Sequence, residues 1–471
     1  MACISASQPV KPSIKSVAVV GGGISGLATA FFLRQAKPDW RVNVFEKERE
    51  PGGKVRTSVH GGFTFDWGPN GFLTTVPETV ELAQALGLDE VLQPAADTAK
   101  FRFLYQDGGL RPLPSAPPGF VTTELLSPFE KVRAGLELFS RPTDREETVH
   151  EFVARHFGTG FADALAGAAV LGTTAGDAHE LSVDALFPKL RALEQQHSSL
   201  LRGLVKQQRE AKKNPKPPGR LTSFKAGGVS TLVEALRTQL GNDLKTGVTV
   251  TDLFFENGGY SLGLSSGDTI QADAVVLATP AFVSAKLLEP LSPTAAKNLA
   301  TIPYADVVVF GLGYDRIDVP QPLDGFGFLV PRGEGVRSLG VLYSSSLFSS
   351  QAPAGKVFLR VICGGTLEPA FIHLSDEDAL SVVRRDLRVT MGITAEPEFV
   401  TQAKWPQGIP QYLLGHHEKV AAAENALGEY PGLYLTGNAY RGVGVNDCVR
   451  DARALAARLA ALPAQPYDED I

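Results

Sequence analysis

A glycine-rich turn between a short apolar strand and an apolar helix constrains this chain more than any other feature. The β-branched run Ser16–Val20 predicts a buried strand, and Leu27–Leu33 carries apolar residues at helical spacing. Between them lie Gly21, Gly22, Gly23, Ile24, Ser25 and Gly26, a G-x-G-x-x-G turn. A second strand, Arg41–Phe45, ends at Glu46. This order of strand, turn, helix and strand indicates a dinucleotide-binding fold.

Each position of the turn has a physical role in such a fold. Gly21 permits the tight turn, Gly23 lets a pyrophosphate approach the backbone, and Gly26 lets the helix pack close to the strand. The free N–H groups at the helix N-terminus face the phosphates. Glu46 ends the second strand, where a carboxylate accepts hydrogen bonds from ribose hydroxyls.

The residues after Glu46 indicate which dinucleotide is bound. A glycine pair and two cations follow it, in Gly52, Gly53, Lys54 and Arg56, and a second glycine-rich turn comprises Gly68, Pro69, Asn70 and Gly71. Such turns let backbone and cations reach a second side of a long cofactor, which an NAD-binding fold does not need. We therefore predict FAD, one per chain. It is expected to be non-covalent because the sequence shows no nucleophile placed to anchor it.

Composition narrows the class of protein further. A net charge of −6 argues against nucleic-acid binding. Cys3, Cys363 and Cys448 have no metal-binding spacing and cannot form a disulfide framework, which favours the cytoplasm. The histidines are scattered, the pair His416-His417 is interpreted as structural, and no metal site is predicted. No apolar run approaches the ~20 residues of a membrane helix, so membrane contact is expected to be peripheral.

Other stretches predict the remaining elements. Ser127–Glu130 has the signature of a helix start, and mainly helical structure is expected over 113–205. The basic, proline-bearing stretch Lys206–Arg220 is interpreted as a solvated linker, with contact to anionic lipid headgroups as the alternative. Leu244–Gln271 is expected to form a β-meander. A second, mostly antiparallel sheet is expected over 302–405, crossed by a helix at Asp376–Met391.

Several strings of the sequence together resemble the flavin-dependent amine oxidase and protoporphyrinogen oxidase superfamily: VAVVGGGISGLATAFFL, PGGKVRT, ADAVVLATP and LTGNAYRGVGVNDCVRDA. Within it, FRFLYQDGGLRPLP, ETVHEFVARHFG, GFGFLVP, GIPQYLLGHHEK and GVGVNDC are similar to the oxygen-dependent protoporphyrinogen oxidases. The resemblance covers nearly the whole chain. It implies oxidation of protoporphyrinogen IX to protoporphyrin IX by molecular oxygen in haem biosynthesis, with hydride passing to flavin N5. It also implies a homodimer, peripheral association with the cytoplasmic face of the cell membrane, and inhibition by diphenyl ethers.

The resemblance also implies an α/β fold of three parts. An FAD-binding domain of p-hydroxybenzoate-hydroxylase type is expected from 14–95, 221–301 and 409–465, and a mixed-sheet substrate domain from 96–112 and 302–408. A helical membrane-associating insertion with the basic linker is expected over 113–220, and an acidic tail over 466–471.

Site residues follow from the resemblance position by position. The implied cofactor contacts include the residues of the two glycine-rich turns, Glu46 and the cations after it. They also include Val250, Trp405, Val443, Gly444 and Val445. The implied substrate contacts are Arg102 on a propionate, Gly172 close to the macrocycle, and Phe326, Leu329 and Ile362 as apolar walls. Asn70 and Leu171 stand where some relatives carry arginine. No acid–base residue is assigned.

Two alternatives stay open at this stage, besides a structural protein with no ligand. One is another flavin-dependent oxidase of the same superfamily, acting on a coproporphyrinogen, an amine or a carotenoid. The other is a non-enzymatic flavin-fold binding protein, against which the retained phosphate turn and Glu46 argue. The sequence does not separate protoporphyrinogen from coproporphyrinogen.

Overall fold

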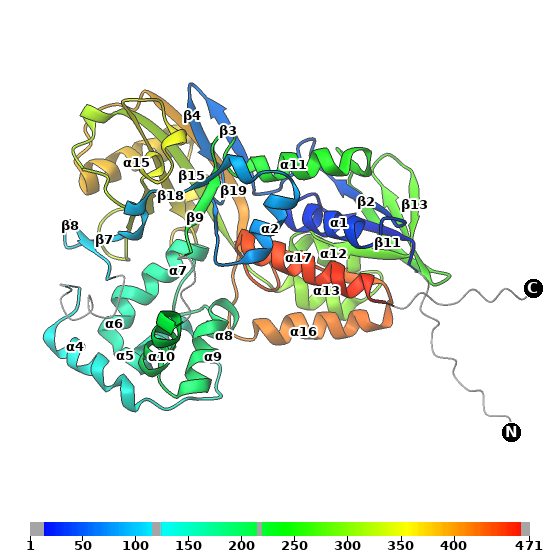
Figure 1. Cartoon of the computed structure of the whole chain (residues 1–471), viewed down its shortest axis with the longest axis horizontal. Coiled ribbons are helices and arrows are strands. Elements are labelled where there is room, and N and C mark those ends of the chain that lie inside the picture. The colour runs from blue at the N-terminus through cyan, green and yellow to red at the C-terminus, as the bar shows by residue number, and fades with distance from the viewer. Residues whose placement is uncertain (1–13, 115–122, 124, 214–218, 463–471) are drawn as a thin grey trace, which may run out of the picture.

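The protein has a parallel-sheet unit, a second sheet unit and a group of helices beneath that second sheet (Figure 1). The structure is a computed structural model that describes residues 14–114, 123, 125–213 and 219–462. The predicted acidic tail lies outside these residues. The predicted α/β class is confirmed.

The parallel sheet is assembled from distant parts of the chain. Its order is β10 (Leu244–Thr246), β2 (Arg41–Glu46), β1 (Ser16–Val20), β14 (Ala274–Leu277) and β20 (Leu433–Leu435). Every pairing in it is parallel. The expectation that Leu244 opens a β-meander was wrong, because β10 pairs with the end of β2. The antiparallel meander contains only β11 (Val250–Glu256), β12 (Gly259–Leu264) and β13 (Thr269–Ala272).

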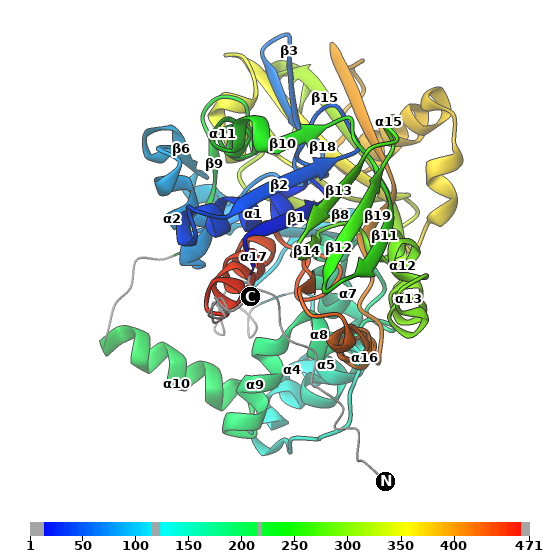
Figure 2. The same cartoon turned by 90° about the vertical axis from the view of Figure 1, so that its right-hand side faces the viewer.

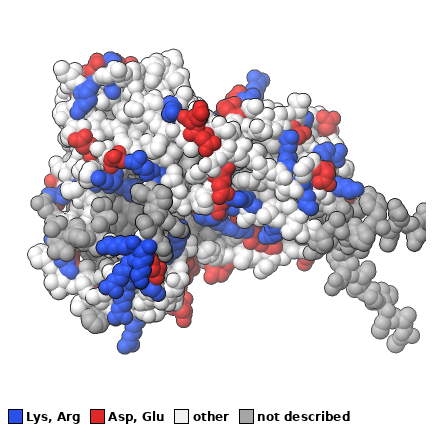
Figure 3. All heavy atoms as spheres, in the orientation of Figure 1, with Lys and Arg blue, Asp and Glu red and all other residues white. Residues whose placement is uncertain are grey.

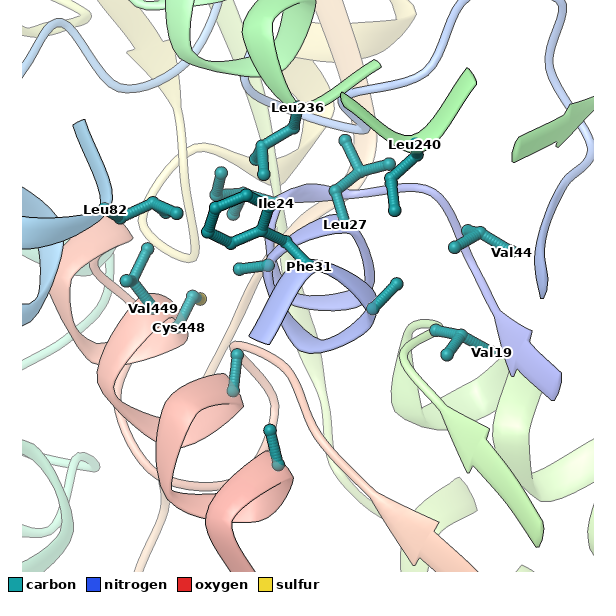
Figure 4. Close-up of a cluster of buried hydrophobic side chains, with 14 of the residues drawn as sticks. Val19, Ile24, Leu27, Phe31, Val44, Leu82, Leu236, Leu240, Cys448 and Val449 are labelled. Carbon is teal, nitrogen blue, oxygen red and sulfur yellow. The ribbon is translucent and has the colours of Figure 1, made fainter. Parts of the chain in front are cut away.

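Helices cover both faces of this sheet (Figure 2). On one face, α1 (Ile24–Ala36) packs against α17 (Val445–Ala460), with α2 (Pro77–Ala85) and α11 (Ser230–Leu240) beside them. Figure 4 shows Phe31 of α1 pointing toward Val449 of α17 and Leu82 of α2, and Leu27 of α1 beside Leu240 of α11. Burying such a leucine or phenylalanine contributes about 1.5–3 kcal/mol each. On the other face lie α12 (Ala281–Leu288), α13 (Pro293–Ala300) and α16 (His416–Ala426).

The second sheet is mixed and has two differently covered faces. Its order is β19 (Phe399–Pro410), β15 (Tyr304–Asp315), β18 (Lys356–Gly364), β17 (Ser338–Leu342), β16 (Gly327–Leu329), β7 (Phe103–Gln106) and β8 (Gly109–Pro112). Helix α15 (Asp376–Met391), which has the predicted bounds, covers one face. Helix α7 (Gly167–Thr174) lies against β16 and β17 on the opposite face. Short strands join the two units: β3 (Thr57–His60), β4 (Phe63–Asp66), β5 (Phe72–Leu73), β6 (Leu92–Pro94) and β9 (Leu221–Phe224).

Among the described residues, the helical part begins with α4 at Pro128, after the predicted 113, and continues past the predicted 205 to Lys213. It comprises α4 (Pro128–Gly135), α5 (Val149–Phe157), α6 (Thr159–Phe161), a π-helical turn (Ala162–Ala166), α7, α8 (Val183–Leu186), α9 (Pro188–His197) and α10 (Leu200–Lys213). The Ser127–Glu130 capping box is confirmed. The interpretation of Lys206–Arg220 as a loop was wrong for its first half, because α10 continues to Lys213. Within the described residues, no helix is both long and apolar enough to cross a membrane.

Candidate functional site

The turn between β1 and α1 leaves one side of the backbone open. A Cβ on Gly26 would lie 2.0 Å from the carbonyl oxygen of Gly21, and Gly21 itself has φ +108°, so both positions require glycine. At Gly23 the opposite holds, because no heavy atom lies within 4 Å of an added Cβ. This open side at the N-terminus of α1 is where an anionic group can reach the free N–H groups.

Glu46 lies directly beneath this turn. Its Oε2 accepts a hydrogen bond from the backbone N–H of Gly22 at 2.7 Å, and its Oε1 accepts one from Glu48 at 2.9 Å. A carboxylate has about four acceptor positions, so it retains capacity for ribose hydroxyls. The backbone oxygen of Glu46 accepts from Val248 at 2.9 Å, which brings the start of β11, with buried Val250, to the same end of the sheet.

The second group of predicted cofactor residues packs on the first. The N–H of Gly52 donates to the oxygen of Gly22 at 2.7 Å, and a Cβ on Gly53 would lie 3.3 Å from the Cα of Gly23. A Cβ on Gly68 would lie 2.4 Å from the oxygen of Lys54. Strings from separate parts of the sequence therefore form one continuous surface.

Trp405 extends this surface toward the second sheet. Its indole Nε1 donates to the backbone oxygen of Trp67 at 2.8 Å, and the two indole rings lie 6.2 Å apart. The N–H of Trp67 in turn donates to the oxygen of Arg56 at 2.9 Å. The structure thus connects Arg56 to β19 through a pair of tryptophans.

The N-terminus of α17 meets that of α1. Cys448, in the first turn of α17, hydrogen-bonds Ser25 in the first turn of α1 and lies close to Lys54. Burial raises the pKa of the Cys448 thiol to about 12 and lowers the pKa of the Lys54 ammonium to about 8. A thiol that stays protonated at neutral pH is a poor nucleophile.

Some buried polar atoms at this surface have no partner among the described residues. They include Nε of Arg56, Nε of Arg360, and Oδ1 of Asn446 in the first turn of α17. Buried polar atoms are nearly always hydrogen-bonded, so each of these needs a partner. With the open side at Gly23 and the two adjoining helix N-termini, the residues fit a dinucleotide that carries a flavin.

Two residues that were not predicted from the sequence hold this surface in place. Nη2 of Arg360 donates to the oxygen of Gly68 at 2.6 Å, and its side chain is almost fully buried beside Asp66. The Tyr412 hydroxyl accepts from the N–H of Gly442 at 2.9 Å and donates to the oxygen of Asn438 at 2.5 Å. A lone arginine in the apolar run of β18 was the available signal for Arg360.

Two predicted substrate residues, Leu329 and Ile362, lie together on the second sheet. Leu329, Gly340 and Ile362 are neighbours in register across β16, β17 and β18, so their Cα–Cβ directions point to one face. Gly172 of α7 lies over this row, since a Cβ there would lie 3.3 Å from Cδ1 of Leu329. A Cβ on Gly340 would lie 2.9 Å from Cδ2 of Leu329, so the Leu329 side chain packs against both glycines. We call Leu329, Gly340 and Ile362 the apolar row.

Arg102 and Phe326 form a separate pair. The guanidinium of Arg102 lies 4.9 Å from the ring centroid of Phe326, and the N–H of Phe326 donates to the oxygen of Phe101 at 2.7 Å. Phe326 packs in a different apolar cluster from Leu329, together with Phe348. Arg102 precedes β7 instead of lying within it.

Comparison with known proteins identifies relatives over almost the whole chain. Residues 24–460 match the family of flavin-containing amine oxidoreductases. A chloroplastic protoporphyrinogen oxidase of Oryza sativa is 34% identical, covering 97% of this chain and 90% of the relative. A coproporphyrinogen III oxidase of Bacillus subtilis is 30% identical, covering 93% of this chain and 97% of the relative.

Solved structures agree with this placement. A crystal structure from Exiguobacterium, provisionally named a protoporphyrinogen oxidase, has a TM-score of 0.82 at 28% identity, covering 95% of this chain and 99% of that one. UDP-galactopyranose mutase, with a TM-score of 0.73 at 15% identity over 96% of each chain, shares the fold. The chain belongs to the flavin-containing amine oxidoreductase family, among relatives that include protoporphyrinogen and coproporphyrinogen III oxidases.

Proposed function

We propose that this protein is an FAD-dependent oxidase that converts protoporphyrinogen IX to protoporphyrin IX with molecular oxygen, in haem biosynthesis. The observation that carries the proposal is the apolar row beside Gly172, whose residues are uncharged and suit a large, mostly apolar macrocycle. The identity of 34% to the rice protoporphyrinogen oxidase supports it.

The residues proposed to hold one non-covalent FAD are those of the two glycine-rich turns with Glu46, Lys54 and Arg56, together with Val250, Trp405 and the start of α17. A bound flavin supplies the hydride acceptor for three two-electron oxidations and returns the electrons to oxygen as hydrogen peroxide. The protonated thiol of Cys448 supports non-covalent binding.

The protein's own contribution to the reaction is mainly positional. Removing hydride from the macrocycle gains conjugation, so orientation matters more than a strong base. The apolar row and Gly172 would fix the plane of the macrocycle, and Arg102 would pair with a propionate at the edge. We assign no acid–base residue.

Coproporphyrinogen III is the second candidate substrate. Relatives in Bacillus subtilis and Staphylococcus aureus carry the name coproporphyrinogen III oxidase, at 30% and 27% identity. This substrate has propionates where protoporphyrinogen has vinyl groups, so it needs more cationic partners at the edge of the site. Arg102 is one such candidate cation, because it lies 4.9 Å from the ring of Phe326.

The test is to mix the purified yellow protein with each porphyrinogen without oxygen, add oxygen, and follow porphyrin fluorescence and hydrogen peroxide. We expect faster turnover of protoporphyrinogen, and near loss of turnover in Leu329→Arg, which places a cation on the apolar row. Ile317→Arg is the matched control, because Ile317 is 92% exposed. Faster turnover of coproporphyrinogen would select the second candidate, and turnover of neither would reject both.

We also propose that the helical part attaches peripherally to the anionic cytoplasmic face of the cell membrane. Phe129, Val132 and Leu136 are 79%, 68% and 52% exposed on and just after α4. Figure 3 shows lysines and arginines gathered over α10. An apolar surface next to cations binds reversibly to anionic lipid. A homodimer and inhibition by diphenyl ethers are proposed from the family resemblance alone.

A further inference from the structure

Three side chains with metal-binding chemistry meet in the helical part, away from the proposed flavin site. They are His150 near the start of α5, Asp163 in the π-helical turn, and His179 in the segment after α7. One ligand atom from each lies within 4.8 Å of the other two. The closest approach is 2.8 Å, between Nε2 of His150 and Oδ1 of Asp163.

Backbone hydrogen bonds hold the two histidines beside each other. The N–H of His150 donates to the oxygen of Ala178 at 2.9 Å, and the N–H of Val149 donates to the oxygen of Leu181 at 2.8 Å. The N–H of His179 donates to Oδ1 of Asp177 at 3.0 Å. The two imidazole rings stack with centroids 3.8 Å apart. Their positions are therefore set by the backbone.

The third side chain is placed by an unusual piece of backbone. Ala162–Ala166 forms a π-helical turn, a rare geometry that is frequent at functional sites. Ala162 and Ala166 are buried in the core of the helical part, which leaves Asp163 on the outer side of the turn. The Asp163 side chain is 65% exposed and that of His150 only 15%. The cluster is thus open to solvent on the carboxylate side.

We propose that His150, Asp163 and His179 form a binding site for a divalent cation of the Zn²⁺ class. Two imidazoles and one carboxylate suit zinc, copper or nickel, whereas calcium and magnesium prefer oxygen ligands alone. Water from the open side would complete a tetrahedral set. The bound cation would join α5, the π-helical turn and the segment after α7. This proposal does not depend on the proposed oxidase activity.

The test uses untagged, flavin-loaded protein that has been treated with a chelator. Zn²⁺ binding is measured by competition with a coloured chelator, and the melting temperature is recorded with and without Zn²⁺. We expect one Zn²⁺ per chain and a higher melting temperature. His179→Ala and Asp163→Asn should each weaken binding by more than the ~10-fold typical of losing an outer-shell partner. Both side chains are exposed, so folding should survive.

A matched variant and a spectrum separate this site from adventitious binding. His60→Ala removes an exposed histidine from β3 and should leave Zn²⁺ affinity unchanged. Cu²⁺ bound to the wild-type protein should show two coupled imidazole nitrogens by electron paramagnetic resonance, and only one in His179→Ala. Equal Zn²⁺ affinity in the wild type and His179→Ala would overturn the proposal. In that case His150 and Asp163 would form a hydrogen-bonded pair and no cation site.

Discussion

Lys54 lies at a position where a positive charge is costly. Its ammonium is buried between the glycine-rich turns and the start of α17, and burial lowers its pKa to about 8. Near neutral pH the group is mostly protonated, and above pH 8 it is mostly neutral. An anionic cofactor bound nearby favours the protonated form.

FAD affinity should therefore depend on pH in the alkaline range. Binding would take up a proton above the pKa of free Lys54, so the dissociation constant should rise by up to about tenfold per pH unit above pH 8 and be nearly constant below it. The measurement is flavin fluorescence titration of the apoprotein from about pH 6 to about pH 9.5. Lys54→Met should remove the dependence, whereas Lys297→Met, on an exposed lysine, should keep it. A dependence that persists in Lys54→Met would contradict this assignment.

Arg102 is expected to anchor substrate without taking part in the chemistry. If so, Arg102→Ala should raise KM more than it lowers kcat. The rise in KM should correspond to about 1–3 kcal/mol of lost free energy of charge-assisted pairing. Steady-state kinetics with protoporphyrinogen measures this. Lys100→Ala is the control, because Lys100 likewise lies over a neighbouring ring, 5.1 Å from the centroid of Phe101. A large fall in kcat at constant KM would instead place Arg102 in the transition state.

At the scale of elements, α4 and α10 expose side chains of two different kinds. Helix α4 exposes apolar side chains, and α10 carries Lys206, Arg209, Lys212 and Lys213 on exposed positions. Both helices belong to the helical part (Figure 1), and Figure 3 shows the cations of α10 on its surface.

The protein should float with anionic vesicles at low salt and less so at high salt, because salt screens the attraction. Replacing Phe129 and Val132 by serine, or Lys206 and Lys212 by glutamate, should each reduce the floating fraction. Ile317→Ser removes an even more exposed apolar side chain elsewhere and should not. If the wild-type protein never floats, α4 is a lid or a contact between subunits.

Elements with their own local chemistry could be predicted from the sequence. The Ser127–Glu130 capping box and the bounds of α15 needed only neighbouring residues. The length of α10 was underestimated because its charged residues suggested a loop. No proline interrupts the chain between Leu200 and Pro215, so the helix can continue. Strand β10 was misplaced because its partner, β2, is distant in sequence.

The same distinction applies to the candidate sites. The glycine-rich turns could be predicted because their spacing requires glycine for local steric reasons. Arg360 and Tyr412 could not, since their partners Gly68 and Gly442 reach them only through tertiary packing. His150, Asp163 and His179 come from separate segments, so the sequence predicted no metal site.

For the molecule as a whole, a buried charge network ties the helical part together. Glu137 is fully buried and accepts hydrogen bonds from His156 at 2.9 Å and Ser199 at 2.6 Å, while the other ring nitrogen of His156 lies 3.1 Å from Glu194. Burial alone would raise the pKa of Glu137, but these hydrogen bonds and two backbone N–H groups lower it. The ionised carboxylate therefore stabilises the folded state above the unfolded pKa.

Glu137→Gln should destabilise the protein by about 3–5 kcal/mol at neutral pH, as expected when one partner of a buried ionic network is removed. The stability difference from the wild type should shrink as pH falls below the ordinary glutamate value of 4.5, because the wild-type carboxylate then protonates. Denaturant unfolding at several pH values measures it. Glu289→Gln, on an exposed glutamate, is the control. A difference that stays constant into acid would contradict the ionised role.

The packing of α1 against α17 also constrains when the protein becomes active during its synthesis. The first helix emerges from the ribosome at the beginning of translation, but α17 and the strand β20 emerge near the end. Until then one side of α1 has no partner and the parallel sheet lacks an edge strand. We therefore expect flavin loading to follow chain completion, and a chain that terminates before α17 to lack part of the proposed cofactor site.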